Sequence, residues 1–160
     1  MWTATPSKDW AGVGQGKQGN PLVGAAVKDT ANSIAYVEWS YAIQNNLPQA
    51  QIDNGAGPVE LTAETVAKTV ATATVAPSGP GDLTLKLDYA TKTPGAYPIL
   101  LVSYEIVCTK YSDPAKGELV KSFMNFISSS AEQAAVHNLG YAALPSAVAG
   151  KVQAQIAKIS

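Results

Sequence analysis

The sequence predicts an α/β fold with a mixed or mostly parallel sheet flanked by helices, and three observations lead to this class. Segments rich in β-branched and aromatic residues alternate with segments of helical periodicity. Apolar residues make up 46% of the 160 residues and charged residues 14%, which is typical of a globular chain rather than a disordered one. A chain of this length is expected to fold around a single core.

The first part of the chain is predicted to pass from a loop into a helix. The first twenty residues combine tryptophans, a proline and several glycines without any periodicity, which indicates a loop. Asn20 and Pro21 then predict a helix start, because the Asn side chain can accept an orphan N–H and Pro has no N–H to satisfy. That helix is expected to end near Asp29. The pattern continues with a strand at 33–39, a short helix ending at Asn45-Asn46, an edge strand at 49–53 and a turn at 54–58.

A second clear helix is predicted to begin at Thr62 and to end before Pro77. Glu64 favours the positive N-terminal end of this helix. Its apolar face is expected to carry Val66, Val70 and Ala73. A turn at 78–82, an alternating strand at 83–89 and a connection at 91–98 follow.

The last third is predicted to hold one long buried strand, at 97–110, followed only by helices. Asp113 and Pro114 repeat the signal of a capping side chain followed by proline. A second helix is expected to close at Gly140, and Ser146 is expected to cap a third. The apolar face of the first of these helices is predicted to be formed by Leu119, Phe123, Phe126 and Ile127.

Charge and hydropathy exclude several classes of function. The formal net charge of -1 provides no basic field for nucleic acid or for anionic lipid. The longest apolar run, 97–108, is shorter than the roughly 20 residues that a membrane span needs. The first residues have neither the basic start nor the apolar stretch of a signal peptide, so none is expected in this chain.

The residue types that carry most enzyme chemistry are sparse. Cys108 and His137 are the only cysteine and histidine, so no metal site of the His/Cys type is expected, and no cofactor is expected either. Cys108 is predicted to be a small buried hydrophobe, and no spacing brings two carboxylates together. Glu105 either has a partner inside the apolar strand or lies on its solvated face. The chain is not expected to be an enzyme.

A glycine-rich stretch before the first helix is the one candidate for anion binding. Backbone N–H groups and the helix dipole can hold an anion at such a place, and the candidate residues are Gly16, Lys17 and Asn20. The alternative is a plain flexible loop with a solvated lysine. The stretch follows no clear strand, and its spacing fits neither the dinucleotide nor the Walker pattern.

Four segments, in this order, resemble the phosphate-binding protein of the bacterial phosphate ABC transporter, and in particular its actinobacterial members. The segments are GVGQGKQGNPLVGAAVKDT at 12–30, SIAYVEWSYAIQNNLPQAQI at 33–52, YPILLVSYEIVCTKYSDPAKG at 97–117 and LGYAALPSAVAGKV at 139–152. The resemblance is to the C-terminal half of that family. It implies a fragment of a type II, Venus-flytrap binding protein, which captures phosphate between two lobes and delivers it to a permease.

The resemblance also implies how the chain is divided and where it works. Residues 1–93 would be the latter part of one lobe and residues 97–160 the returning segment of the other, with neither lobe complete. The parent protein would lie outside the cytoplasmic membrane, in the periplasm or on the cell surface, commonly as a lipoprotein.

The family holds phosphate with backbone N–H groups, hydroxyls, an arginine and a carboxylate. This chain contains no arginine and lacks the family's main ligand motifs, so no family ligand is carried over to a residue here. The truncated chain is therefore not expected to bind phosphate alone, and a second chain or a second copy is expected to complete the fold. A ligand-free interaction or surface-antigen fragment is the alternative.

Overall fold

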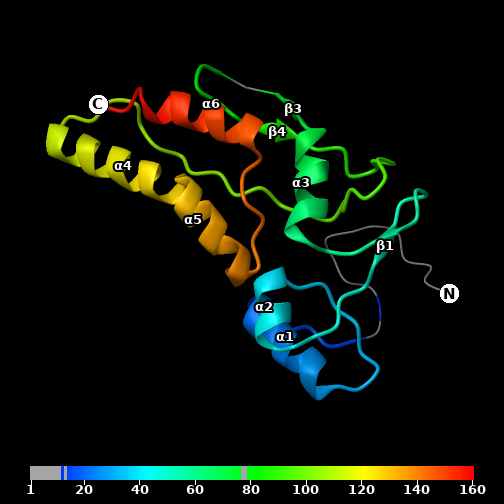
Figure 1. Ribbon diagram of the computed structural model, residues 1–160. Coiled ribbons are helices and arrows are strands. Elements are labelled where there is room, and N and C mark those ends of the chain that lie inside the picture. The colour runs from blue at the N-terminus through cyan, green and yellow to red at the C-terminus, as the bar shows by residue number, and fades with distance from the viewer. Residues whose placement is uncertain (1–11, 13, 77–78) are drawn as a thin grey trace. The chain divides into compact units, whose positions relative to one another are not determined.

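The computed structural model describes residues 12, 14–76 and 79–160 (Figure 1). These residues form two compact units, one ending at Leu47 and the other beginning at Pro48. Helices dominate, and the short strands among the described residues pair only as two antiparallel ladders. The α/β class is confirmed. The tryptophans and the proline of the predicted N-terminal loop lie outside the described residues.

The first unit contains two helices that contact each other, α1 (Gly19–Asp29) and α2 (Trp39–Gln44). Helix α1 ends where the sequence predicts but begins at Gly19, so Asn20 lies inside it and Gln18 is the N-cap. The strand predicted at 33–39 is wrong: no described residue there is in a strand, and Ile34 and Tyr36 are almost fully exposed. A strand needs a neighbour for its backbone N–H and C=O groups, and none of the described strands pairs with this segment.

Both ladders belong to the second unit. Strands β1 (Ile52–Asp53) and β2 (Pro58–Val59) pair around the predicted turn, whose Gly55 and Gly57 amides donate to Oδ1 of Asp53 at 2.7 and 3.1 Å. Strands β3 (Thr74–Val75) and β4 (Leu85–Lys86) form the other pair. The predicted strand at 83–89 therefore shortens to two residues. The end of the predicted second helix becomes β3.

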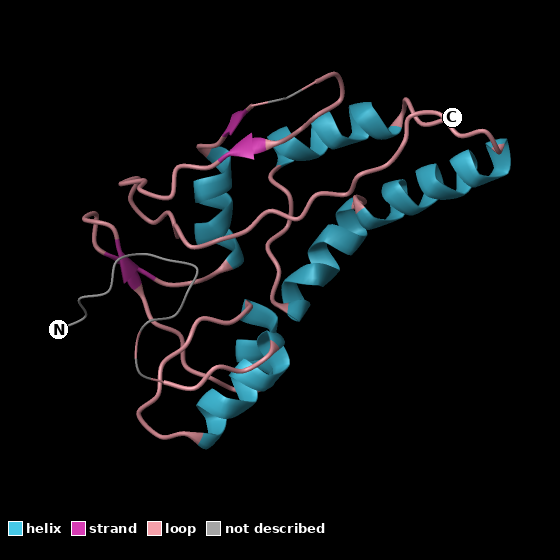
Figure 2. Cartoon of the chain, turned by 180° about the vertical axis from the view of Figure 1, so that it is seen from behind, coloured by secondary structure: helices cyan, strands magenta, loops and turns pink. Residues whose placement is uncertain are grey.

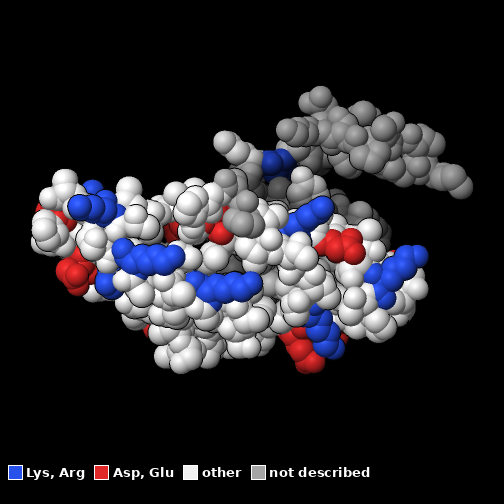
Figure 3. Space-filling model, turned by 90° about the horizontal axis from the view of Figure 1, so that it is seen from above, with Lys and Arg blue, Asp and Glu red and all other residues white. Residues whose placement is uncertain are grey.

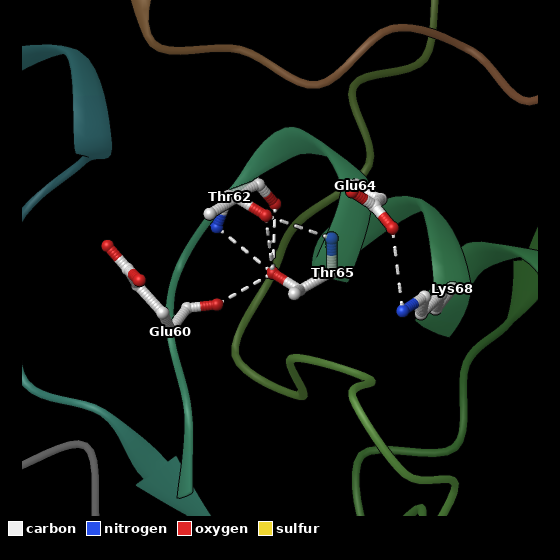
Figure 4. Close-up of polar contacts among 5 residues, drawn as sticks. All are labelled: Glu60, Thr62, Glu64, Thr65 and Lys68. Atoms are coloured by element: carbon white, nitrogen blue, oxygen red, sulfur yellow. Dashed lines mark hydrogen bonds and ion pairs between the residues drawn. The ribbon is translucent and has the colours of Figure 1, made fainter.

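Helix α3 (Ala63–Ala71) begins with a reciprocal cap, shown in Figure 4. The Thr65 amide donates to the Thr62 hydroxyl at 3.1 Å, and the Thr62 amide donates to the Thr65 hydroxyl at 3.0 Å. The Thr65 hydroxyl also donates to the Glu60 carbonyl at 2.7 Å. The exposed Glu64–Lys68 pair, 3.6 Å apart, adds little because water screens it. The cap therefore fixes the predicted start of this helix.

The long buried strand predicted at 97–110 does not form. Tyr97 is fixed to α3 by two hydrogen bonds. Its amide donates to the Thr65 carbonyl at 3.0 Å, and its carbonyl accepts from the buried Thr69 hydroxyl at 2.6 Å. From 98 to 107 the backbone makes no hydrogen bond to any described residue, and Figure 2 shows this stretch as loop. Leu101 is 92% exposed, and Cys108 is exposed rather than buried as predicted. The missing element is a neighbouring strand.

Helices α4 (Pro114–Ile127), α5 (Ser130–Ala135), the 3-10 helix η1 (Val136–Leu139) and α6 (Ser146–Ile156) complete the chain. The predicted cap of α4 is confirmed, since the Ala115 amide donates to Oδ1 of Asp113 at 2.9 Å. Gly140, with φ of 84°, closes η1 in the left-handed conformation, also as predicted. The prediction for Ser146 is wrong, because Pro145 is the N-cap and Ser146 is the first helical residue.

Two small apolar clusters hold the second unit together. One joins Val59, Val66 and Tyr97, and burial raises the pKa of the Tyr97 hydroxyl. The other joins Met124 of α4 to Ile156, the last residue of α6, and to Ile159 beyond that helix. Partly buried neighbours complete this second cluster: Tyr111, Val120, Ile127 and Val152.

The apolar face predicted for α4 is largely wrong. Of its four residues only Ile127 packs against the core. The other three are exposed, at 70% for Leu119, 55% for Phe123 and 58% for Phe126. Helix α4 therefore carries a second apolar stripe, each of whose residues is more than half exposed.

Backbone bonds fix the last residue of the chain. The Ser160 amide donates to the Thr109 carbonyl at 2.9 Å, and the Tyr111 amide donates to the Ser160 carbonyl at the same distance. The Lys121 ammonium donates to the Ile159 carbonyl at 3.0 Å and so satisfies an orphan acceptor beyond α6. These bonds attach the C-terminal end to Thr109 and Tyr111, which precede α4, and to Lys121 within α4.

Candidate functional site

The predicted anion-binding residues lie at the N-terminal end of α1. Gly16 and Lys17 are exposed on the loop before the helix, and a Cβ placed on Gly16 would meet nothing within 4 Å. The backbone N–H groups from Gly16 to Asn20 donate to no other described residue. The first turn of α1 contains no acidic residue. This end therefore offers backbone donors, the positive end of the helix dipole and one ammonium group.

Asn20 has a different role from the predicted cap. Its Oδ1 accepts from the Glu38 amide at 3.1 Å, which ties the start of α1 to the start of α2. The Ser40 hydroxyl donates to Oε1 of Glu38 at 2.9 Å, which holds that carboxylate at the N-terminal end of α2. The structure thus brings Asn20 together with Glu38, a partner that the sequence did not indicate. The available sequence signal was the position of Glu38 immediately before a short helix, because a carboxylate favours the positive end of a helix dipole.

The chemistry that this end of α1 can support is the attraction of a small anion. Exposed groups at a helix N-terminus contribute roughly 0.3–1 kcal/mol to such an interaction. This contribution is far below the binding free energy that is needed to hold a dehydrated anion tightly. A strong site here would need ligands in addition to Gly16, Lys17 and Asn20.

The other titratable candidates do not assemble into a site. Cys108 is exposed, and Glu105 is exposed as in the solvated interpretation. His137 lies in the last turn of η1. In the described part of the chain, no three His, Cys, Asp or Glu side chains are grouped so that they could hold a metal ion.

A cavity of about 210 Å³ lies in the second unit, between α3, the β3–β4 ladder and the start of α6. Its walls are mainly aliphatic, and Lys151 is its one charged residue. None of the three candidate anion-binding residues lines it. The face shown in Figure 3 has lysines and carboxylates interspersed among neutral atoms, with no continuous area of one sign. None of the helices built from described residues is both long and apolar enough to cross a membrane.

Comparison with known proteins places the chain in a class of binding proteins. Residues 3–131 match the family described as the PBP superfamily domain, and the chain belongs to this family.

The chain is similar to proteins named for phosphate binding. It is 44% identical over 138 residues to phosphate-binding protein PstS 3 of Mycobacterium tuberculosis, a match covering 84% of this chain and 37% of the relative. It is 40% identical over 153 residues to PstS 2 of the same species, covering 93% and 41%. It is 33% identical over 171 residues to PstS of Methanocaldococcus jannaschii, covering 89% and 43%. The chain thus spans less than half the length of each of these relatives.

Proposed function

We propose that this chain is part of the phosphate-binding component of an ABC-type phosphate uptake system. The observation that carries the proposal is the 44% identity to a protein named for phosphate binding. The chain would work outside the cytoplasmic membrane, in the periplasm or as a lipoprotein at the cell surface, and would help to deliver phosphate to the permease. Its role would be binding and not catalysis, in keeping with the scattered positions of its titratable groups.

The division into lobes is part of the same proposal. Residues 1–93 would belong to one lobe and residues 97–160 to the other, with the crossing near Thr93–Tyr97. One feature supports this place. The Ala96 amide donates to the Thr93 carbonyl at 3.1 Å in a turn whose Gly95 has φ of 73°. The chain changes direction at this turn, and Tyr97, which follows it, is bonded to Thr65 and Thr69 of α3.

The phosphate ligands would come mostly from outside these 160 residues. The end of α1 offers donors at the exposed Gly16 and Lys17 and at the partly buried Asn20, but the sequence has no arginine to pair with two phosphate oxygens at once. We therefore expect this chain alone to show no saturable binding of phosphate. The whole protein would bind it.

The test is calorimetry with inorganic phosphate, with sulfate as the control anion. The 160-residue chain is titrated alone and again after assembly with the portion of PstS 3 that it does not match, expressed as a separate polypeptide. We expect saturable phosphate binding only by the assembled protein. An assembled protein that binds neither anion, or binds sulfate as well as phosphate, would contradict the proposed function.

Variants of the assembled protein test the candidate residues. Lys17→Ala is expected to weaken phosphate binding about threefold to fivefold, because it removes one exposed positive charge worth up to about 1 kcal/mol. Lys28→Ala is the matched control, since Lys28 lies in the last turn of α1, at the opposite end of the helix from Lys17. Equal effects of the two substitutions would remove Gly16, Lys17 and Asn20 from the site.

A further inference from the structure

The uncovered stripe of α4 has the geometry of a binding surface. Leu119, Phe123 and Phe126 are spaced by four and then three residues, so they lie on one face of the helix. The neighbouring face carries Met124, which packs against α6. Fully burying one exposed phenyl or isobutyl group contributes about 1.5–3 kcal/mol, so three such groups that are each more than half exposed favour a partner. We call these three residues the α4 stripe.

A second, independent feature lies in the same unit. Residues 98–107, here called the open segment, leave their backbone unpaired among the described residues, and Leu101 and Ile106 are 92% and 93% exposed. The segment is nevertheless held in place. Tyr97 fixes one end to α3, and within the segment the Tyr104 hydroxyl accepts from the Leu85 amide at 2.9 Å. An unpaired backbone that is already positioned is a template for strand addition.

We infer that the α4 stripe and the open segment together form the docking surface for the polypeptide that makes up the remaining length of this protein's relatives. Each relative named above is a protein of which this chain spans 37–43%, so more than half of its length is available as the occupant. A second copy of this chain would duplicate the part already present and supply none of the rest. The surface needs apolar side chains for the stripe and an extended strand for the open segment. This inference rests on family membership and not on phosphate being the ligand.

Complex formation tests the inference. The chain is coexpressed with the portion of Mycobacterium tuberculosis PstS 3 that it does not match, carried on a separate affinity-tagged polypeptide, and the mass of the product is measured in solution. We expect a complex with one copy of each polypeptide. Phe123→Asp is expected to weaken the complex at least tenfold, since desolvated aromatic anchors dominate such interfaces. Asn125→Asp is the matched control, because Asn125 is exposed on another face of α4.

A second variant protects the test against misfolding. Leu101→Lys changes the open segment, where no described helix or strand depends on the side chain, and it is expected to weaken the complex as Phe123→Asp does. Circular dichroism of each free variant confirms that its helices are intact. The inference is overturned if no complex forms, or if both variants assemble as well as Asn125→Asp. It is also overturned if the free chain is a dimer that Phe123→Asp dissociates, since the occupant would then be a second copy.

Discussion

Replacing Ile156 by alanine is expected to lower the free energy of unfolding of the second unit by about 2–4 kcal/mol. Ile156 is 3% exposed and joins α6 to Met124 of α4, so the shorter side chain leaves a cavity between the two helices. The measurement is urea denaturation followed by circular dichroism. Helices this short depend on packing more than on propensity, so the C-terminal helices should melt together with the unit.

Leu119→Ala is the matched control for this prediction. It removes the same number of carbon atoms from a side chain that is 70% exposed, so its expected cost is below about 0.5 kcal/mol in the free chain. In the proposed complex with the unmatched portion of PstS 3, Leu119→Ala should become destabilising. Equal costs for the two substitutions in the free chain would show that the core does not lie between α4 and α6 as described.

Replacing Gly117 by alanine is expected to destabilise the chain by about 1–3 kcal/mol, although alanine is the better helix former. A Cβ on Gly117 would lie 2.8 Å from the backbone carbonyl carbon of Ser160 and 3.1 Å from its oxygen. Ser160 is held there by its bonds with Thr109 and Tyr111, so the strain falls on backbone and not on a flexible side chain. Thermal denaturation measures the loss.

Gly150→Ala separates this steric effect from helix propensity. Gly150 lies inside α6, and a Cβ there would meet nothing within 4 Å. The substitution should therefore stabilise the chain by up to about 1 kcal/mol. Opposite signs for the two glycine-to-alanine changes are the expected result. If both changes stabilise the chain, the contact between Ser160 and α4 is absent in solution.

The helix boundaries that depend on a few adjacent residues were predictable from the sequence. Asp113 followed by proline marks the start of α4, Thr62 marks the start of α3, and Gly140 closes η1, because each signal acts on the backbone within one turn. Ser146 was predicted to be the N-cap of α6 but is its first helical residue, because the proline immediately before it takes the cap position. Such local signals carry most of what the sequence predicts correctly here.

The strands were not predictable in the same way. Residues 33–39 and 97–110 have strong β propensity, but propensity describes how a residue fits a sheet and does not provide the neighbouring strand. Cys108 was predicted to be buried in the second of these strands, and it is exposed because that strand does not form. Periodicity predicted a single apolar face on α4 and could not show that Met124 would be covered while Phe123 stayed exposed.

The candidate site was predictable only in part. Gly16 and Lys17 are found as exposed loop residues before a helix, as their types indicate. The bond from the Glu38 amide to Asn20 joins residues eighteen positions apart, and no local pattern encodes such a contact. That bond replaces the predicted capping role, so the first helix begins at Gly19 without a side-chain cap.

The most direct test of the proposed docking between this chain and the unmatched portion of PstS 3 is hydrogen exchange of the backbone amides of residues 99–107, since Pro98 has none. These amides are expected to exchange at nearly the unfolded rate in the free chain, because they have no described partner, whereas the amides of α4 are protected. After assembly with the unmatched portion of PstS 3, the same amides should become strongly protected as the predicted strand forms. Strong protection in the free chain, or no change on assembly, would contradict the proposal that another polypeptide pairs with this segment.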